Sequence, residues 1–296
     1  MTRLKPPTAK LLAVTLSFLG LFISMHTLAQ QHWGDVILDG ARQRLITSVH
    51  TCQQYRIYID VPTSQPPASG FPVLYLLDGD STFSTAMQIN RNKQRRTKIT
   101  GYQSAIIVGI GYVATGRDMF AARTLDYTLA TGTTTPAGAG GAELFLDFLE
   151  TELKPIIGAL QPINPTKQGI FGHSYGGLFA LHALFSRPDS FDTYIAASPS
   201  IWWQQQAILH SISKGYQLEK NLLITAGTAE DKKEQRSPEI MAILALRKML
   251  QPAKDLVAML NAQPHSGKLQ FTALIDEDHG SAKYTALSRA LDFFLL

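Results

Sequence analysis

The sequence predicts an α/β fold in which a mostly parallel central sheet carries helices on both faces. The first observation is a series of short, almost wholly apolar runs, which are typical of strands buried on both faces. The second is that segments with a helical spacing of apolar residues alternate with these runs. The third is size, because 296 residues, 45% of them hydrophobic, can bury a substantial core within a single domain.

The predicted elements follow one another along the chain. Residues 43–51 and 54–61 are expected to form a hairpin of two strands, and the turn-rich stretch 62–72 follows it. Strands buried on both faces are expected at residues 72–77, 104–110 and 169–171, and further strands at 192–197, 221–226 and 268–275. Helices are expected at residues 142–160, 240–260 and 282–294. Residues 112–141 read as a long loop, a length typical of lids and binding loops.

The N-terminus has the pattern of a secretory signal peptide. Three basic residues precede the uncharged apolar stretch 11–25, which is shorter than the roughly 20 residues of a membrane span. Small residues before Gln30 suit cleavage, so residues 1–29 are expected to be removed, leaving no stable membrane span. The alternative is a retained anchor. Residues 30–296 are then expected to form one domain that is secreted across the inner membrane into the periplasm.

The charge balance argues against a nucleic-acid-binding protein. Residues 1–29 carry three positive charges and no negative ones, so their removal lowers the formal charge of +4 to about +1. A basic run remains within residues 91–98, which is expected either to be a solvated helix face or to meet an anionic ligand. Cys52 is the single cysteine, so the fold forms without an internal disulfide.

Residues 172–176 contain the pattern G-x-S-x-G between a predicted strand and the helical pattern 178–185. A serine on a sharp strand-to-helix turn projects its hydroxyl, and only very small residues fit two positions to either side. Ser174 is therefore predicted to be the nucleophile of an α/β-hydrolase fold. The neighbouring side chains, His173 and Tyr175, are expected to pack beside the turn.

A serine hydroxyl needs a general base, which a third group must orient. The fold predicts the chain order serine, acid, histidine. His279 is preferred as the base because it follows the last predicted strand, whereas His265 lies in a polar turn before it. The loop after strand 221–226 supplies the acid, with Glu230 as first choice and Asp231 as the alternative.

Two backbone amides are expected to stabilise the oxyanion. One belongs to Tyr175, directly after the nucleophile, and the other to Asp80, in the loop after strand 72–77. Asp78 and Asp80 could instead be metal ligands, but no further carboxylate or histidine has suitable spacing. No metal or cofactor is therefore expected.

The motifs together resemble the esterase-D-like Putative esterase family of α/β-hydrolases, and most closely its bacterial trilactone esterases for catecholate siderophores of the enterobactin and salmochelin type. The matching stretches are residues 75–80, 108–112, 123–128, 172–177, 198–203 and 278–280. The resemblance implies a small ester substrate, such as a ferric or free siderophore. Arg123, Trp202 and Trp203 could then meet the charge and the rings of catechol groups. Some such enzymes are described as using a serine–histidine pair without a firm acid.

Three functions remain open on the sequence alone. The leading one is a serine ester hydrolase that forms an acyl-enzyme on Ser174. The second is an acyltransferase, or an esterase for other small acyl or sugar esters. The third is a hydrolase fold that binds a ligand without turnover.

Overall fold

The computed structural model describes residues 33–212, 215–232 and 237–296. Residues 40–296 form one compact unit, and residues 33–38 have no helix or strand. The signal peptide predicted at residues 1–29 lies outside the described residues. In the described part, no helix is both long enough and apolar enough to cross a membrane.

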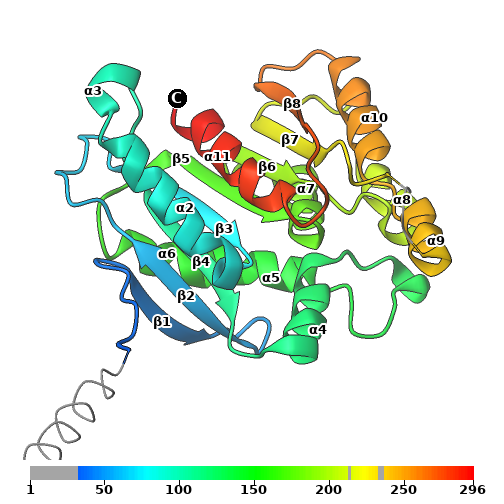
Figure 1. The fold of residues 1–296 in the computed structure, drawn as a ribbon, viewed down its shortest axis with the longest axis horizontal. Coiled ribbons are helices and arrows are strands. Elements are labelled where there is room, and N and C mark those ends of the chain that lie inside the picture. The colour runs from blue at the N-terminus through cyan, green and yellow to red at the C-terminus, as the bar shows by residue number, and fades with distance from the viewer. Residues whose placement is uncertain (1–32, 213–214, 233–236) are drawn as a thin grey trace, which may run out of the picture. The chain divides into compact units, whose positions relative to one another are not determined.

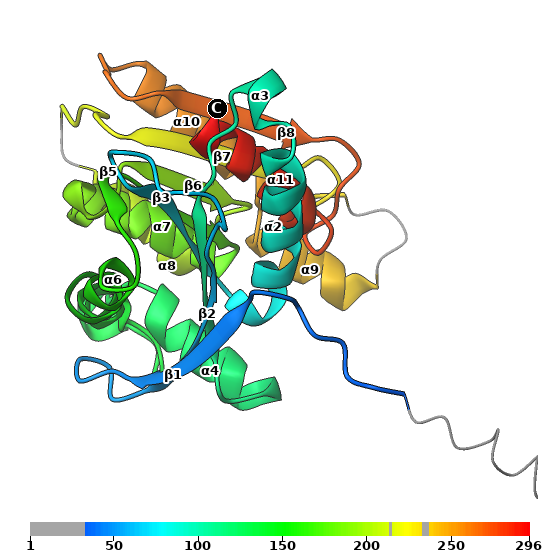
Figure 2. The same cartoon turned by 90° about the vertical axis from the view of Figure 1, so that its left-hand side faces the viewer.

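Eight strands form one sheet in the order β1-β2-β4-β3-β5-β6-β7-β8. They are β1 (Arg42–Thr47), β2 (Gln54–Asp60), β3 (Phe71–Leu77), β4 (Ile106–Tyr112), β5 (Ile163–His173), β6 (Thr193–Ala197), β7 (Asn221–Gly227) and β8 (Leu269–Leu274). The pairs β1/β2 and β2/β4 are antiparallel and every other pair is parallel. Figure 2 shows β1 and β8 at opposite ends of this twisted sheet. The predicted early hairpin and mostly parallel sheet are confirmed.

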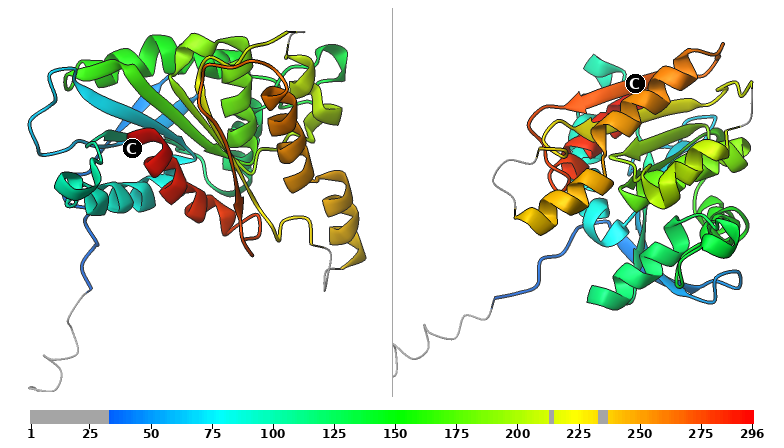
Figure 3. Two further views of the ribbon diagram at one scale, coloured as in Figure 1. Left: turned by 90° about the horizontal axis from the view of Figure 1, so that it is seen from above. Right: turned by 90° about the vertical axis from the view of Figure 1, so that its right-hand side faces the viewer.

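Helices cover both faces of the sheet (Figures 1 and 3). They are α2 (Gly79–Gln94), α3 (Thr97–Thr100), α4 (Gly116–Tyr127), α5 (Ala142–Phe148), α6 (Lys154–Gly158), α7 (Tyr175–Ser186), α8 (Trp203–His210), α9 (Pro238–Leu246), α10 (Leu250–Asn261) and α11 (Ala282–Leu295). Helices α2 and α11 lie side by side on one face, and α5 and α7 lie on the other. The strands between these layers, β3, β4 and β6, are buried along their whole length, as their apolar runs predict.

Predicted elements differ from the structure in several places; the strand expected at 169–171, for example, is part of the longer β5. Residues 112–141, expected to be a loop, contain α4, whose buried residues are only Asp126 and Tyr127. Its other residues are exposed or only partly buried, so the helix lacks the apolar periodicity that identifies a packed helix. The helix expected at 240–260 is interrupted between α9 and α10. The helix expected at 142–160 contains a π-helical turn, Leu149–Leu153, between α5 and α6.

Candidate active site

Ser174 occupies a tight turn between β5 and α7. Its backbone has φ +61° and ψ −117°, a conformation that is strained for a residue with a side chain. The turn needs glycine nearby, because a β-carbon on Gly172 would lie 2.1 Å from the carbonyl oxygen of Gly176. One on Gly177 would lie 2.9 Å from the carbonyl oxygen of Ala197. These close approaches give the physical reason for small residues around the serine.

The structure brings Ser174, His279 and Glu230 together in one chain of hydrogen bonds. The Oγ of Ser174 lies 3.0 Å from Nε2 of His279, and Nδ1 of His279 lies 2.7 Å from Oε2 of Glu230. The serine, acid and histidine follow β5, β7 and β8. These strands are parallel, so their carboxyl ends meet at one edge of the sheet.

Glu230 is held on both carboxylate oxygens. Its Oε2 contacts His279, and its Oε1 accepts hydrogen bonds from the Ser198 hydroxyl and the Gly227 amide, each at 2.5 Å. The side chain is fully buried. Asp231, the alternative acid, instead accepts hydrogen bonds from the amides of Met249 and Leu250 at the start of α10. Of the two acids, the structure therefore places Glu230 against the histidine.

His173 packs beside His279 but carries no charge there. The two ring centroids are 4.5 Å apart. Burial, followed by the neighbouring His279, Arg123 and Lys283, holds the pKa of His173 well below its usual value. A neutral His173 adds no positive charge beside His279, which agrees with the packing role expected from the sequence.

The two amides expected to bind the oxyanion lie in the first turns of helices. Tyr175 begins α7, and Asp80 is in the first turn of α2. Amides in a first turn have no carbonyl four residues earlier within the helix, so they are available as donors. The carboxylate of Asp80 is engaged elsewhere, because it accepts hydrogen bonds from the Tyr112 amide and the Tyr58 hydroxyl. The oxyanion role of both amides stays a prediction.

A cavity of about 300 Å³ opens beside Ser174. Its lining consists of Phe120, Arg123, Ser174, Tyr175, Ser200, Trp202, Glu230, Arg247, Met249 and His279. Trp202 lies on this wall, as expected. Trp203 is 8% exposed and is absent from the lining; its ring packs edge-on against Tyr175, with centroids 5.4 Å apart. Its expected contact with substrate is replaced by packing behind the wall.

Arg123 lies between this cavity and a second one of about 300 Å³ that reaches Asp78 and Lys283. Its guanidinium donates Nε to Oδ1 of Asp78 at 2.6 Å and Nη2 to Oδ2 at 2.9 Å. The same Nη2 donates to the carbonyl of His173 at 2.9 Å. Arg123, predicted to meet the substrate's charge, thus already has a carboxylate partner.

The residues after Arg123 fix α4 in place, a role that the sequence did not reveal. Asp126 accepts hydrogen bonds from the hydroxyls of Tyr55 and Tyr112 and from the Gln53 amide. The Tyr127 hydroxyl accepts one from the Asp78 amide. This stretch therefore positions Arg123 against the turn after β3.

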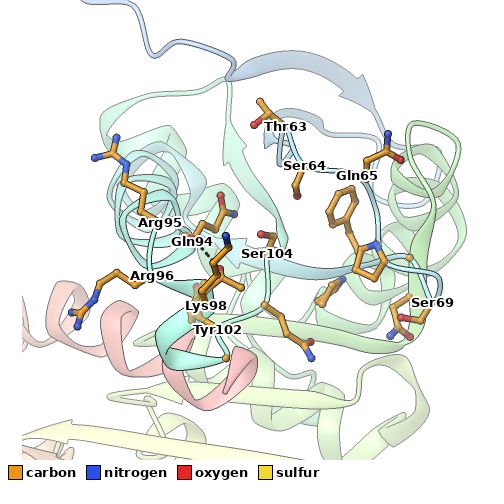
Figure 4. A pocket seen from close by; sticks show the side chains of 18 of the residues that line it. Thr63, Ser64, Gln65, Ser69, Gln94, Arg95, Arg96, Lys98, Tyr102 and Ser104 are labelled. Carbon is orange, nitrogen blue, oxygen red and sulfur yellow. Dashed lines mark hydrogen bonds between the residues drawn. The ribbon is translucent and has the colours of Figure 1, made fainter.

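A larger cavity, of about 860 Å³, lies away from Ser174, between the segment that precedes β3 and the turn from α2 to β4 (Figure 4). None of its lining residues is acidic, and the basic run contributes Arg95, Arg96 and Lys98. In the view, Arg95 and Arg96 point away from the hollow. The two other members of the run form ion pairs, Arg91 with Asp60 and Lys93 with Asp292. The described residues contain no group of three or more potential ligands suited to a metal ion.

Comparisons with known proteins identify the family of the chain. The sequence model of the Putative esterase family matches residues 48–270. The ferri-bacillibactin esterase BesA of Bacillus subtilis is 36% identical over 274 residues, covering 87% of this chain and 90% of the relative. The siderophore triacetylfusarinine C esterase of Aspergillus fumigatus is 36% identical over 239 residues, covering 75% and 81%.

A solved structure agrees as well. The BES protein from Bacillus cereus superposes with a TM-score of 0.77 at 32% sequence identity, covering 90% of this chain and 98% of that one. The expected α/β-hydrolase fold is thereby confirmed. On the match of the family model and of these relatives, the chain belongs to the Putative esterase family and is a serine carboxylic-ester hydrolase.

Proposed function

We propose that the protein hydrolyses the ester bonds of a catecholate siderophore-like substrate, with Ser174 as nucleophile, His279 as general base and Glu230 as the group that orients the histidine. The observation that carries this proposal is the hydrogen-bonded chain from Ser174 through His279 to Glu230 at the edge of the sheet. The substrate class is supported by relatives whose names describe siderophore esterases.

The proposed reaction begins with proton transfer from the Ser174 hydroxyl to Nε2 of His279 as Oγ attacks the ester carbonyl. Nδ1–H of His279 donates a hydrogen bond to Glu230, whose negative charge stabilises the imidazolium that forms. The carbonyl oxygen becomes an oxyanion, which the amides of Tyr175 and Asp80 bind.

Collapse of this intermediate expels the alcohol, which takes from His279 the proton that Ser174 gave up. An ester remains on Ser174. Water then attacks the acyl-enzyme with His279 again as base, releasing the acid. The aromatic wall at Trp202 stacks on a ring of the acyl group.

Export across the inner membrane to the periplasm is also part of the proposal, because residues 1–29 have the pattern of a signal peptide.

The test compares the wild-type protein with Ser174→Ala on two substrates, a tricatecholate trilactone and a short-chain p-nitrophenyl ester. We expect kcat/KM to be far higher for the trilactone, and the variant to hydrolyse neither substrate above background. Cleavage of the generic ester alone would reject the siderophore substrate while leaving the hydrolase intact. Equal turnover by the variant would reject Ser174 as nucleophile.

A further inference from the structure

Among the described residues that line the cavity beside Ser174, Arg247 is the cation without a carboxylate partner. Arg123 is paired with Asp78, and Glu230 is committed to His279. None of the carboxylates in residues 33–212, 215–232 and 237–296 forms an ion pair with Arg247. Arg247 is an exposed residue and belongs to the lining, so its charge is available to a ligand in the cavity.

Arg247 is also held against an aromatic ring. Its guanidinium carbon lies 4.8 Å from the centroid of Trp202, and that ring packs against Tyr175 at 5.8 Å. A guanidinium stacked on an indole keeps the N–H groups at its edge free to donate hydrogen bonds. The stacking reduces the freedom that the long side chain would lose on binding a ligand.

Hydrogen bonds to Asp231 hold the backbone that follows Arg247. Arg247 lies in the break between α9 and α10, and the start of α10 is capped by the carboxylate of Asp231. The last residue of the break, Met249, lines the same cavity. The interrupted helix therefore has a consequence for the site, because the break places the cation of Arg247 in the lining of the cavity beside Ser174.

We propose that Arg247 and Trp202 form a subsite for an anionic aromatic group on the acyl side of the ester. The indole contributes aromatic surface beside the ring, and the guanidinium donates hydrogen bonds to its anionic oxygens. Arg123 does not compete for that charge, since Asp78 already neutralises it. The identity of the acyl group rests on the proposed function, and Arg247 is the residue that selects for its negative charge.

The test measures binding rather than turnover. The ligands are two amides that contain no ester bond for the enzyme to cleave. They are the para-sulfonate and the para-methylsulfonyl derivatives of N-benzoylglycinamide. They have similar shape, and only the first is an anion. We expect the wild-type protein to bind the anion about fivefold more tightly, as measured by calorimetry, and the preference to shrink in high salt.

Arg247→Gln is expected to bring the ratio of the two dissociation constants close to one. Lys248→Gln is the matched control, because the neighbouring lysine is exposed and does not line the cavity; it should keep the fivefold ratio. Using a ratio cancels any general loss of folded protein. An unchanged ratio in Arg247→Gln, no preference in the wild type, or no binding of either ligand would overturn the proposal. If the preference is found but the trilactone is not cleaved, the substrate proposal fails and the anionic subsite stands.

Discussion

Asp78 and Arg123 form a bidentate ion pair that joins the turn after β3 to α4. Both side chains are largely buried, with exposed fractions of 15% and 13%. Asp78 itself adopts a left-handed conformation with φ +55°, and Arg123 also contacts the carbonyl of His173, next to the nucleophile. The pair therefore connects three parts of the chain that meet at the active site.

Replacing one member of this pair should be more damaging than replacing both. Arg123→Met leaves the carboxylate of Asp78 buried without its partner, and we expect it to lower the free energy of unfolding by about 3 kcal/mol. Asp78→Asn combined with Arg123→Met should recover part of that loss. Urea denaturation of the two single variants and the double variant measures this coupling. Strictly additive losses would show that the two side chains stabilise the fold independently.

Glu230→Gln tests the acid of the catalytic chain. The amide keeps the size of the side chain but favours the wrong tautomer of His279, so we expect kcat to fall by roughly a thousandfold. Asp231→Asn is the matched control; it weakens the cap of α10 and should cost about 1 kcal/mol of stability with kcat nearly unchanged. An unchanged kcat in Glu230→Gln would favour a serine–histidine pair that works without the acid.

Asp126 should make stability fall as the pH rises. Burial raises its pKa from 3.8 to about 7, against the opposing effect of hydrogen bonds from Tyr55, Tyr112 and Gln53. The folded state thus holds a proton that the unfolded state releases, so this contribution is complete below about pH 4 and is lost as the pH approaches 7. We expect Asp126→Asn to remove a slope of about 1 kcal/mol per pH unit. Unfolding free energies measured at about pH 5 and about pH 8 check this, and parallel pH profiles of the two proteins would contradict it.

The turn at Ser174 should not tolerate a methyl group at Gly172. A β-carbon there would meet backbone atoms of Gly176, so Gly172→Ala must displace the nucleophile turn, and we expect loss of both activity and several kcal/mol of stability. Gly158→Ala provides the comparison, because the nearest atom to its β-carbon would be the flexible end of Ile163 at 3.4 Å. That variant should fold normally, as thermal unfolding would show. A normal melting temperature for Gly172→Ala would refute the steric argument.

Most of the sheet was predictable because strands buried on both faces consist of apolar runs. β3 and β6 are of this kind, and their predicted bounds lie within one residue of those observed. The chain order of serine, acid and histidine could be inferred because the fold sets which strand ends meet. The sequence offered Glu230 and Asp231 as neighbouring candidates with only a preference for the first. The structure places Glu230 against His279 and Asp231 at the start of α10.

The parts that could not be predicted depend on polar partners distant in the sequence. Nothing near Arg123 indicates that Asp78 will neutralise it, and nothing near Asp126 indicates its two tyrosine partners. The break at Arg247 was missed because the apolar pattern runs through it, while a carboxylate from another loop caps the next helix. Trp203 was expected to bind substrate together with Trp202, because the sequence does not distinguish a tryptophan that lines the cavity from one that packs behind its lining.

The positions of the three side chains proposed for catalysis also have a consequence for the order of folding. Ser174, Glu230 and His279 follow three different strands, and β8, which precedes His279, is the last strand to leave the ribosome. A growing chain therefore contains Ser174 long before it contains His279, the proposed base. Because β8 must pair with β7 before His279 can reach Ser174, hydrolytic activity should appear only when the sheet is complete. Recovery of activity during refolding would therefore report the closing step of folding rather than an early one.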